Sequence, residues 1–265
     1  MSLVLTILGC GSSGGVPRVG QGWGACEPAE PRNRRRRCSV LLERTGARGK
    51  TVVLVDTSPD LREQLLGAGV DRLDGIVLTH SHADHTHGID DVRPLFLSMR
   101  RRIALHMDAA TAVVVRRAFG YIFETPAGSL YPALLDDIRI AAGSPLSIDG
   151  PGGPIDILPF QVHHGEIDAL GLRIGDAVYM PDVKAVPDAS VAFLDGLDML
   201  IIDALRHTPH PSHFSVTDAL GWIARARPSR AVLTNLHTDL DYRALKAAVP
   251  PGVDIAYDGM RLTIG

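Results

Sequence analysis

The sequence contains few cysteines, few aromatic residues and no long run of apolar residues. Its three cysteines, Cys10, Cys26 and Cys38, are an odd number in a chain of 265 residues, so a disulfide framework is not expected. No stretch approaches the roughly 20 uninterrupted apolar residues that a membrane-spanning helix requires. The first residues also lack the basic and apolar segments of a secretion signal. We therefore predict a cytoplasmic protein that has no membrane partner.

An excess of charge of one sign is also absent. The 27 Lys and Arg residues nearly balance the 30 Asp and Glu residues, which gives a formal net charge of −3. General nucleic-acid-binding proteins are strongly basic, so stable binding of nucleic acid is not expected. Two arginine runs, Arg34–Arg37 and Arg100–Arg102, could attract an anionic substrate or simply face the solvent.

Short apolar strands and fewer helices alternate irregularly along the chain. Because the strands outnumber the helices, mixed sheets flanked by helices, an α+β architecture, fit better than a doubly wound parallel sheet. The Gly/Pro-rich pieces are of loop length, so we predict a single domain over residues 1–265. The expected strands are Leu3–Leu8, Cys38–Leu42, Thr51–Asp56, Gly75–Thr79, Ile103–Met107, Ile155–Leu158, Ala177–Met180, Met199–Asp203, Ala231–Thr234 and Val253–Tyr257, and the expected helices are Pro59–Gly67, Ala109–Phe119, Ser215–Arg225 and Asp241–Ala248.

Histidine is concentrated in one region. Of the 11 histidines, four fall within the eight positions that begin at His80. Imidazole is a good ligand for zinc, and the neighbouring carboxylate of Asp84 adds a harder donor. In extended backbone His80 and His82 project to the same side and can share a metal ion, while Asp84 and His85 can bind a second. This spacing favours a metal site over a polar surface loop.

Two complete metal shells need further donors, which must come from other strand ends. Three later predicted strands are followed closely by such residues: the pair His163 and His164, then Asp182, then His237. Of the adjacent histidines we favour His164, because Gly165 lets the backbone turn close to a metal ion.

The order of these donors, together with the strand and aspartate at Val52–Asp56, resembles the metallo-β-lactamase superfamily over nearly the whole chain. The resemblance implies a four-layered αββα sandwich with two divalent metal ions at the edge of its sheets. Zinc is the default metal by ligand type, and manganese is the alternative. We also expect Asp56 and Asp91 to orient ligand histidines. By position, one metal would be held by His80, His82 and His164, the other by Asp84, His85 and His237, and Asp182 would bridge the two.

Three further segments, Gly9–Pro17, Glu30–Arg35 and Thr234–Tyr242, resemble the phosphodiesterase branch that contains phosphoribosyl 1,2-cyclic phosphate phosphodiesterase and is related to tRNase Z. The glycine-rich loop would line the metal cleft, where backbone N–H groups at Ser12 and Ser13 could hold phosphate oxygens. A dinucleotide fingerprint is disfavoured there, because Pro17 stands where that motif requires a helix.

The same resemblance assigns the proton chemistry. His213 and Asp203 match the histidine and acidic residue that are thought to protonate the leaving group, and Arg206 on the same loop is expected to contact phosphate. The cyclic-phosphate enzyme also carries a cysteine cluster for a structural zinc ion. Only Cys26 remains here, so that ion is not expected and the substrate is less certain.

The predicted activity is hydrolysis of a small phosphodiester, cyclic or nucleotide-like. Water activated by the two metals would attack phosphorus, Asp182 would hold the metals together, and His213 would protonate the departing oxygen. A tRNase Z-like RNA endonuclease is one alternative, but it needs a long basic arm. An ester, thioester, lactam or lactone hydrolase is another, and it needs no Asp203–His213 pair. A non-catalytic metal-binding or carrier protein is a third alternative, which the full ligand set and the candidate acid disfavour. The sequence does not determine whether the protein forms a homodimer.

Overall fold

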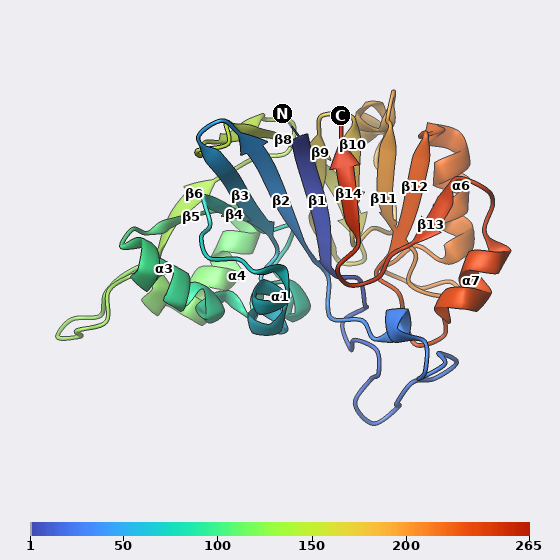
Figure 1. Ribbon diagram of the computed structural model, residues 1–265, viewed down its shortest axis with the longest axis horizontal. Coiled ribbons are helices and arrows are strands. Elements are labelled where there is room, and N and C mark those ends of the chain that lie inside the picture. Colours follow the sequence, from blue (N-terminus) through green and yellow to red (C-terminus); the bar gives the residue numbers. More distant parts are fainter. Residues whose placement is uncertain (1) are drawn as a thin grey trace.

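The computed structural model describes residues 2–265 and consists of two mixed β-sheets packed face to face, with helices on both outer faces (Figure 1). This arrangement confirms the predicted α+β, four-layered αββα sandwich. The first seven-stranded sheet has the order β14 (Arg261–Ile264), β1 (Ser2–Gly9), β2 (Ser39–Gly46), β3 (Gly49–Val55), β4 (Gly75–Val77), β5 (Ile103–Met107) and β6 (Leu135–Arg139). The second has the order β13 (Val253–Ile255), β12 (Arg230–Thr234), β11 (Met199–Asp203), β10 (Ala177–Met180), β9 (Ile167–Ile174), β8 (Ile155–His164) and β7 (Leu146–Ile148).

The helices cover the outer faces of the two sheets. Those of the first half pack on the first sheet through residues such as Leu61 and Val115, and those of the second half pack on the second sheet through Val216 and Leu245. Among residues 2–265, no helix is long and apolar enough to cross a membrane. The helices are α1 (Leu61–Ala68), α2 (Ala83–Thr86), α3 (Arg93–Met99), α4 (Ala109–Phe119), α5 (Asp188–Val191), α6 (Val216–Ala226) and α7 (Tyr242–Ala248), and the 3-10 helices are η1 (Pro31–Asn33), η2 (Ile89–Val92), η3 (Gly120–Ile122) and η4 (Ala192–Leu194).

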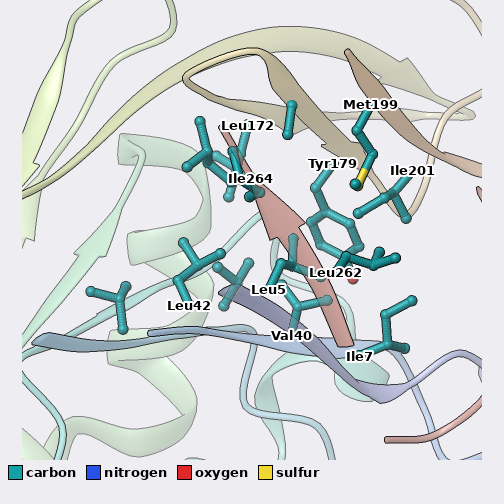
Figure 2. Close-up of a cluster of buried hydrophobic side chains, with 14 of the residues drawn as sticks. Leu5, Ile7, Val40, Leu42, Leu172, Tyr179, Met199, Ile201, Leu262 and Ile264 are labelled. Atoms are coloured by element: carbon teal, nitrogen blue, oxygen red, sulfur yellow. The ribbon is translucent and has the colours of Figure 1, made fainter. Parts of the chain in front are cut away.

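Apolar side chains from both sheets fill the space between them. Leu5 on β1 stands opposite Leu42 on β2 and Leu262 on β14, so these residues share the inner face of the first sheet. They meet Leu172 and Tyr179 of the second sheet (Figure 2). Each fully buried side chain of this kind contributes about 1.5–3 kcal/mol relative to exposure. This core fixes the position of one sheet relative to the other.

All the predicted strands and helices are present, with ends that differ by a few residues. Ser215 and Asp218 form the capping box expected at the start of α6. The sequence did not predict the strands β6, β7, β9 and β14. In β9 the reason is Gly171, which weakens the strand pattern but leaves room for the Phe160 ring, since a Cβ there would lie 2.4 Å from Phe160 Cζ.

The direction of the strands brings several strand ends to one edge of the sandwich. Strands β10, β11 and β12 run parallel to one another, and β4 runs parallel to β3 and β5. Strand β8 is antiparallel to β9, which is antiparallel to β10, so β8 has the direction of β10. Residues just beyond these strands therefore lie near one another.

Candidate metal centre

Three histidines from the two sheets form the first ligand cluster. His80 and His82 follow β4, whereas His164 is the last residue of β8. The Nδ1 atom of His82 lies 3.1 Å from Nε2 of His80 and 3.1 Å from Nε2 of His164. Nitrogen ligands of one tetrahedral zinc ion lie roughly 3.3 Å apart, so these atoms have the spacing of a shared metal site.

Hydrogen bonds on the other side of two of these rings leave the clustered nitrogens free. Nδ1 of His164 donates to the carbonyl oxygen of Ser212 at 2.6 Å, and Nδ1 of His80 lies 3.0 Å from the hydroxyl of Thr79. With the proton on Nδ1, each Nε2 carries a lone pair that can bind a metal ion. Burial lowers the pKa of both His80 and His164, which keeps the rings neutral.

A second cluster contains one imidazole and two carboxylates. Nε2 of His85 lies 3.0 Å from Oδ2 of Asp182 and 3.6 Å from Oδ2 of Asp84. The other oxygen of Asp182, Oδ1, lies 3.8 Å from Nε2 of His164 in the first cluster. Asp182, which follows β10, thus faces both clusters, as a bridging ligand would.

Asp56 fixes the orientation of His85. Its Oδ2 accepts a hydrogen bond from Nδ1 of His85 at 2.8 Å, and its Oδ1 accepts one from the backbone N–H of Thr79 at 2.8 Å. Because the carboxylate accepts at Nδ1, Nε2 of His85 is directed to the second cluster. Burial lowers the pKa of His85, but the charges of Asp182 and Asp56 outweigh this effect and raise it well above its usual value, so a bound metal ion would replace the proton on Nε2. Asp91 lies in η2 and makes no hydrogen bond to a histidine within the described residues.

Two polar atoms of the second cluster are buried without a hydrogen-bond partner: Nε2 of His85 and Oδ2 of Asp182. They lie 3.0 Å apart and face each other within the cluster. An unpaired buried polar group costs about 1–3 kcal/mol, and a divalent cation between the two atoms would satisfy both. The mixed imidazole and carboxylate donors suit zinc or manganese, so the residues fit a metal ion.

The predicted acid pair is assembled beside the clusters. Nδ1 of His213 donates to Oδ2 of Asp203, the last residue of β11, at 2.8 Å, and it lies 3.6 Å from Oδ1 of Asp182. Burial lowers the pKa of His213, but the charges of Asp203 and Asp182 outweigh this effect and raise it to about 9. His213 is therefore an imidazolium near neutral pH and has a proton to give.

Asn235 is a site residue that the sequence analysis missed. It is the first residue after β12 and is buried, with a positive φ of 59°. Its Nδ2 lies 3.1 Å from Oδ1 of Asp203, 3.1 Å from Nδ1 of His213 and 3.4 Å from Oδ1 of Asp182. Its place directly after an apolar strand was the signal that could have identified it.

His237 lies outside both clusters. Nη1 of Arg18 donates to Nε2 of His237 at 2.8 Å, and Nδ1 of His237 donates to Asp239 at 2.7 Å. Both ring nitrogens are thus occupied by protein groups, and within residues 2–265 neither joins a metal-ligand group. The ligand role of His237 stays a prediction.

The predicted substrate contacts lie on two loops. Ser12 is buried, its hydroxyl has no hydrogen-bond partner, and its N–H donates to the Leu236 carbonyl at 3.3 Å. Ser13 is exposed. Arg206 is bound to its own loop, because Nε and Nη2 donate to the carbonyls of Thr208 and Pro209. These roles also stay predictions.

Comparison with known proteins gives the same family from independent data. A model of the β-lactamase superfamily domain matches residues 51–235. The crystal structure of a new diphosphatase from the PhnP family is 35% identical, with a TM-score of 0.88 over 99% of this chain and 98% of that chain. Zinc-bound PqqB from Methylobacterium extorquens shares the fold, with 19% identity and a TM-score of 0.74 over 98% of this chain and 100% of that chain.

A curated relative shows a different protein length. An octanoyltransferase from Porphyromonas gingivalis is 32% identical over 263 residues, which cover 97% of this chain but 51% of the octanoyltransferase. The chain therefore spans about half the length of that relative.

The His/Asp clusters are of the kind typical of a dinuclear metallo-β-lactamase site. They lie at the sheet edge of an αββα sandwich, and the family match spans most of the chain. The chain therefore belongs to the metallo-β-lactamase superfamily and is a metal-dependent hydrolase.

Proposed function

We propose that this hydrolase is a dinuclear phosphodiesterase that cleaves a P–O bond in a small, nucleotide-like molecule, either a phosphodiester or a diphosphate that joins two groups. The observation that carries the proposal is the Asp203–His213 pair, which lies beside both metal clusters. The similarity to a diphosphatase from the PhnP family supports phosphorus as the reacting centre. A cytoplasmic location belongs to the same proposal.

His213 acts on the leaving group. An alkoxide or phosphate that leaves phosphorus needs a proton, and an imidazolium held by a buried carboxylate can supply it. Asp203 orients the ring through Nδ1, so Nε2–H is the proton that is given. Asn235 holds the other oxygen of Asp203, which keeps the pair aligned.

The histidines and carboxylates of the two clusters would hold the metal ions. His80, His82 and His164 would bind one ion, while Asp84 and His85 would bind the other. When bound, divalent metal ions lower the pKa of a coordinated water and neutralise charge on phosphoryl oxygens. Asp182 contacts both clusters and fixes their separation.

The arginine runs do not favour the RNA endonuclease alternative. Arg35 is buried and donates to the His237 carbonyl, and Nε of Arg37 pairs with Asp60 at 2.9 Å. In the second run Arg101 pairs with Asp74, and Arg102 pairs with Asp136. Three of the seven arginines are thus paired with carboxylates and a fourth is buried, so less positive charge is available to bind a long polyanion.

The ester and lactam alternatives are tested by how the rate depends on the leaving group. We expect His213→Ala to lower kcat about 10²–10⁴-fold on a ribose-based cyclic phosphate or a dinucleoside diphosphate, whose leaving oxygen needs a proton. The loss on bis(p-nitrophenyl) phosphate should be much smaller, because p-nitrophenolate leaves without protonation. His207→Ala, which changes an exposed histidine, is the matched control.

If His213→Ala and the unchanged protein cleave the substrates with poor leaving groups at equal rates, His213 is not the general acid. Turnover of carboxylic esters or lactams with no turnover of any phosphorus substrate would overturn the proposed function.

A further inference from the structure

The two ligand clusters differ in the number and type of their donors. The first offers three imidazole nitrogens, from His80, His82 and His164, and faces one oxygen of Asp182. The second offers one imidazole, from His85, and the carboxylates of Asp84 and Asp182. The first cluster can therefore complete a tetrahedral shell from protein atoms alone, whereas the second cannot.

The donor expected to complete the second cluster is used elsewhere. Nε2 of His237, the nitrogen that would bind a metal, accepts a hydrogen bond from Nη1 of Arg18 at 2.8 Å. On the other side of the ring, Asp239 accepts from Nδ1 at 2.7 Å. To bind a metal ion, His237 would have to give up Arg18 and rotate away from Asp239.

Asn235 occupies the position at the end of β12 that faces the clusters, and its amide is turned so that it cannot replace His237. Its Nδ2 faces two carboxylate oxygens, of Asp182 at 3.4 Å and Asp203 at 3.1 Å. Carboxylates accept hydrogen bonds, so the NH₂ group must be on that side. The carbonyl oxygen, the only atom of the amide that could bind a metal ion, lies 3.9 Å from Sγ of Cys38 and points away from Asp182.

We propose that the two metal subsites are unequal. The three-histidine subsite retains its ion, while the subsite of Asp84, His85 and Asp182 binds an ion weakly and exchanges it. The weak subsite has open positions for water and for substrate oxygens. Its oxygen-rich donor set accepts manganese as well as zinc, whereas the three imidazoles select zinc. Only the role given to substrate oxygens rests on the proposed function.

Counting metal ions tests the proposal without a substrate. Metal-free protein is titrated with zinc in competition with a chromophoric chelator, and protein loaded with zinc is dialysed and analysed by mass spectrometry. We expect one ion per chain after dialysis and a second binding event at least about 100-fold weaker than the first. Two ions that bind with equal affinity and survive dialysis would overturn the proposal.

Two variants locate the cause. Asn235→His places an imidazole at the end of β12, close to Asp182, and should raise the number of ions retained from one to two. His237→Ala is the matched control and should leave both zinc affinities unchanged, because the ring nitrogens of His237 are bound to Arg18 and Asp239 instead of facing a cluster. Loss of an ion in His237→Ala would overturn the proposal. If Asn235→His does not fold, the zinc titration of the unchanged protein still tests whether the two subsites differ in affinity.

Cobalt supplies a separate readout of the geometry. Tetrahedral Co²⁺ absorbs far more strongly in the visible region than six-coordinate Co²⁺. The first equivalent should therefore give an intense band and the second a weak one, and two equally intense increments would contradict the unequal subsites. Unequal subsites in a protein that cleaves no phosphorus substrate would leave this inference standing and refute the proposed function.

Discussion

Asp56 offers a sharp test of how the centre is organised, through the substitution Asp56→Asn. Asparagine has nearly the same shape and tolerates the φ of 62° found at this position. Its carbonyl oxygen can keep the hydrogen bonds from the N–H and hydroxyl of Thr79, at 2.8 and 3.1 Å. Its NH₂ group then faces Nδ1 of His85, 2.8 Å from the present carboxylate oxygen. Because NH₂ can only donate, His85 must accept at Nδ1 and carry its proton on Nε2.

A proton on Nε2 blocks the nitrogen of His85 that faces Asp182. Changes to a group that orients a metal ligand cost about 10–100-fold in metal affinity, or about 1.4–2.7 kcal/mol. The free energy of unfolding of the metal-free protein should fall by only about 1 kcal/mol, because replacing the carboxylate by an amide costs one hydrogen bond. Zinc competition titration and urea unfolding of metal-free protein measure the two effects. If folded Asp56→Asn binds the second, more weakly held zinc ion as tightly as the unchanged protein does, this role of Asp56 is refuted. Asp60→Asn is the control outside the clusters.

Three further changes test the fold. Ser215→Ala removes the side chain that accepts from the N–H of Asp218 and should lower the free energy of unfolding by about 1 kcal/mol, with an unchanged urea m-value. Gly171→Ala brings a methyl group against the Phe160 ring and should cost about 1–3 kcal/mol in the same assay. Burial raises the pKa of Asp258 to about 6 in the folded protein, so the folded state holds this proton more tightly than the unfolded chain. The contribution of Asp258 to the free energy of unfolding is therefore largest below about pH 4 and decreases by about 2–3 kcal/mol as the pH rises through 6. Asp258→Asn should flatten this part of the curve of stability against pH.

The sequence pattern predicted the fold where strands are short, apolar and bounded by turn residues. Strands β5, β10 and β11 have the predicted bounds, because their residues are almost all buried and mostly apolar. Strand β6 was missed because its half-buried acidic residues and its exposed end do not resemble a buried strand. It is identified only by its pairing with β5 at the sheet edge.

The rule that donors follow strand ends predicted His80, His164 and Asp182 as neighbours, and the structure brings them together. It could not separate Asn235 from His237, since both follow β12 closely. The left-handed backbone at Asn235 turns the chain, so the first residue faces the carboxylates and the histidine two positions later faces Arg18. A turn of this kind depends on contacts with the glycine-rich loop, which is distant in sequence.

The histidines of the first ligand cluster come from both sheets, so a bound ion would also affect the stability of the folded protein. His82 and His164 are 82 residues apart in the chain, so an ion that joins them closes a large loop and ties the two halves of the sandwich together. This link exists only while the ion is bound, and at a free zinc concentration of 1,000 times Kd it adds about 4 kcal/mol to the free energy of unfolding. The supply of metal would then set how long the protein persists in its folded state as well as whether it is active.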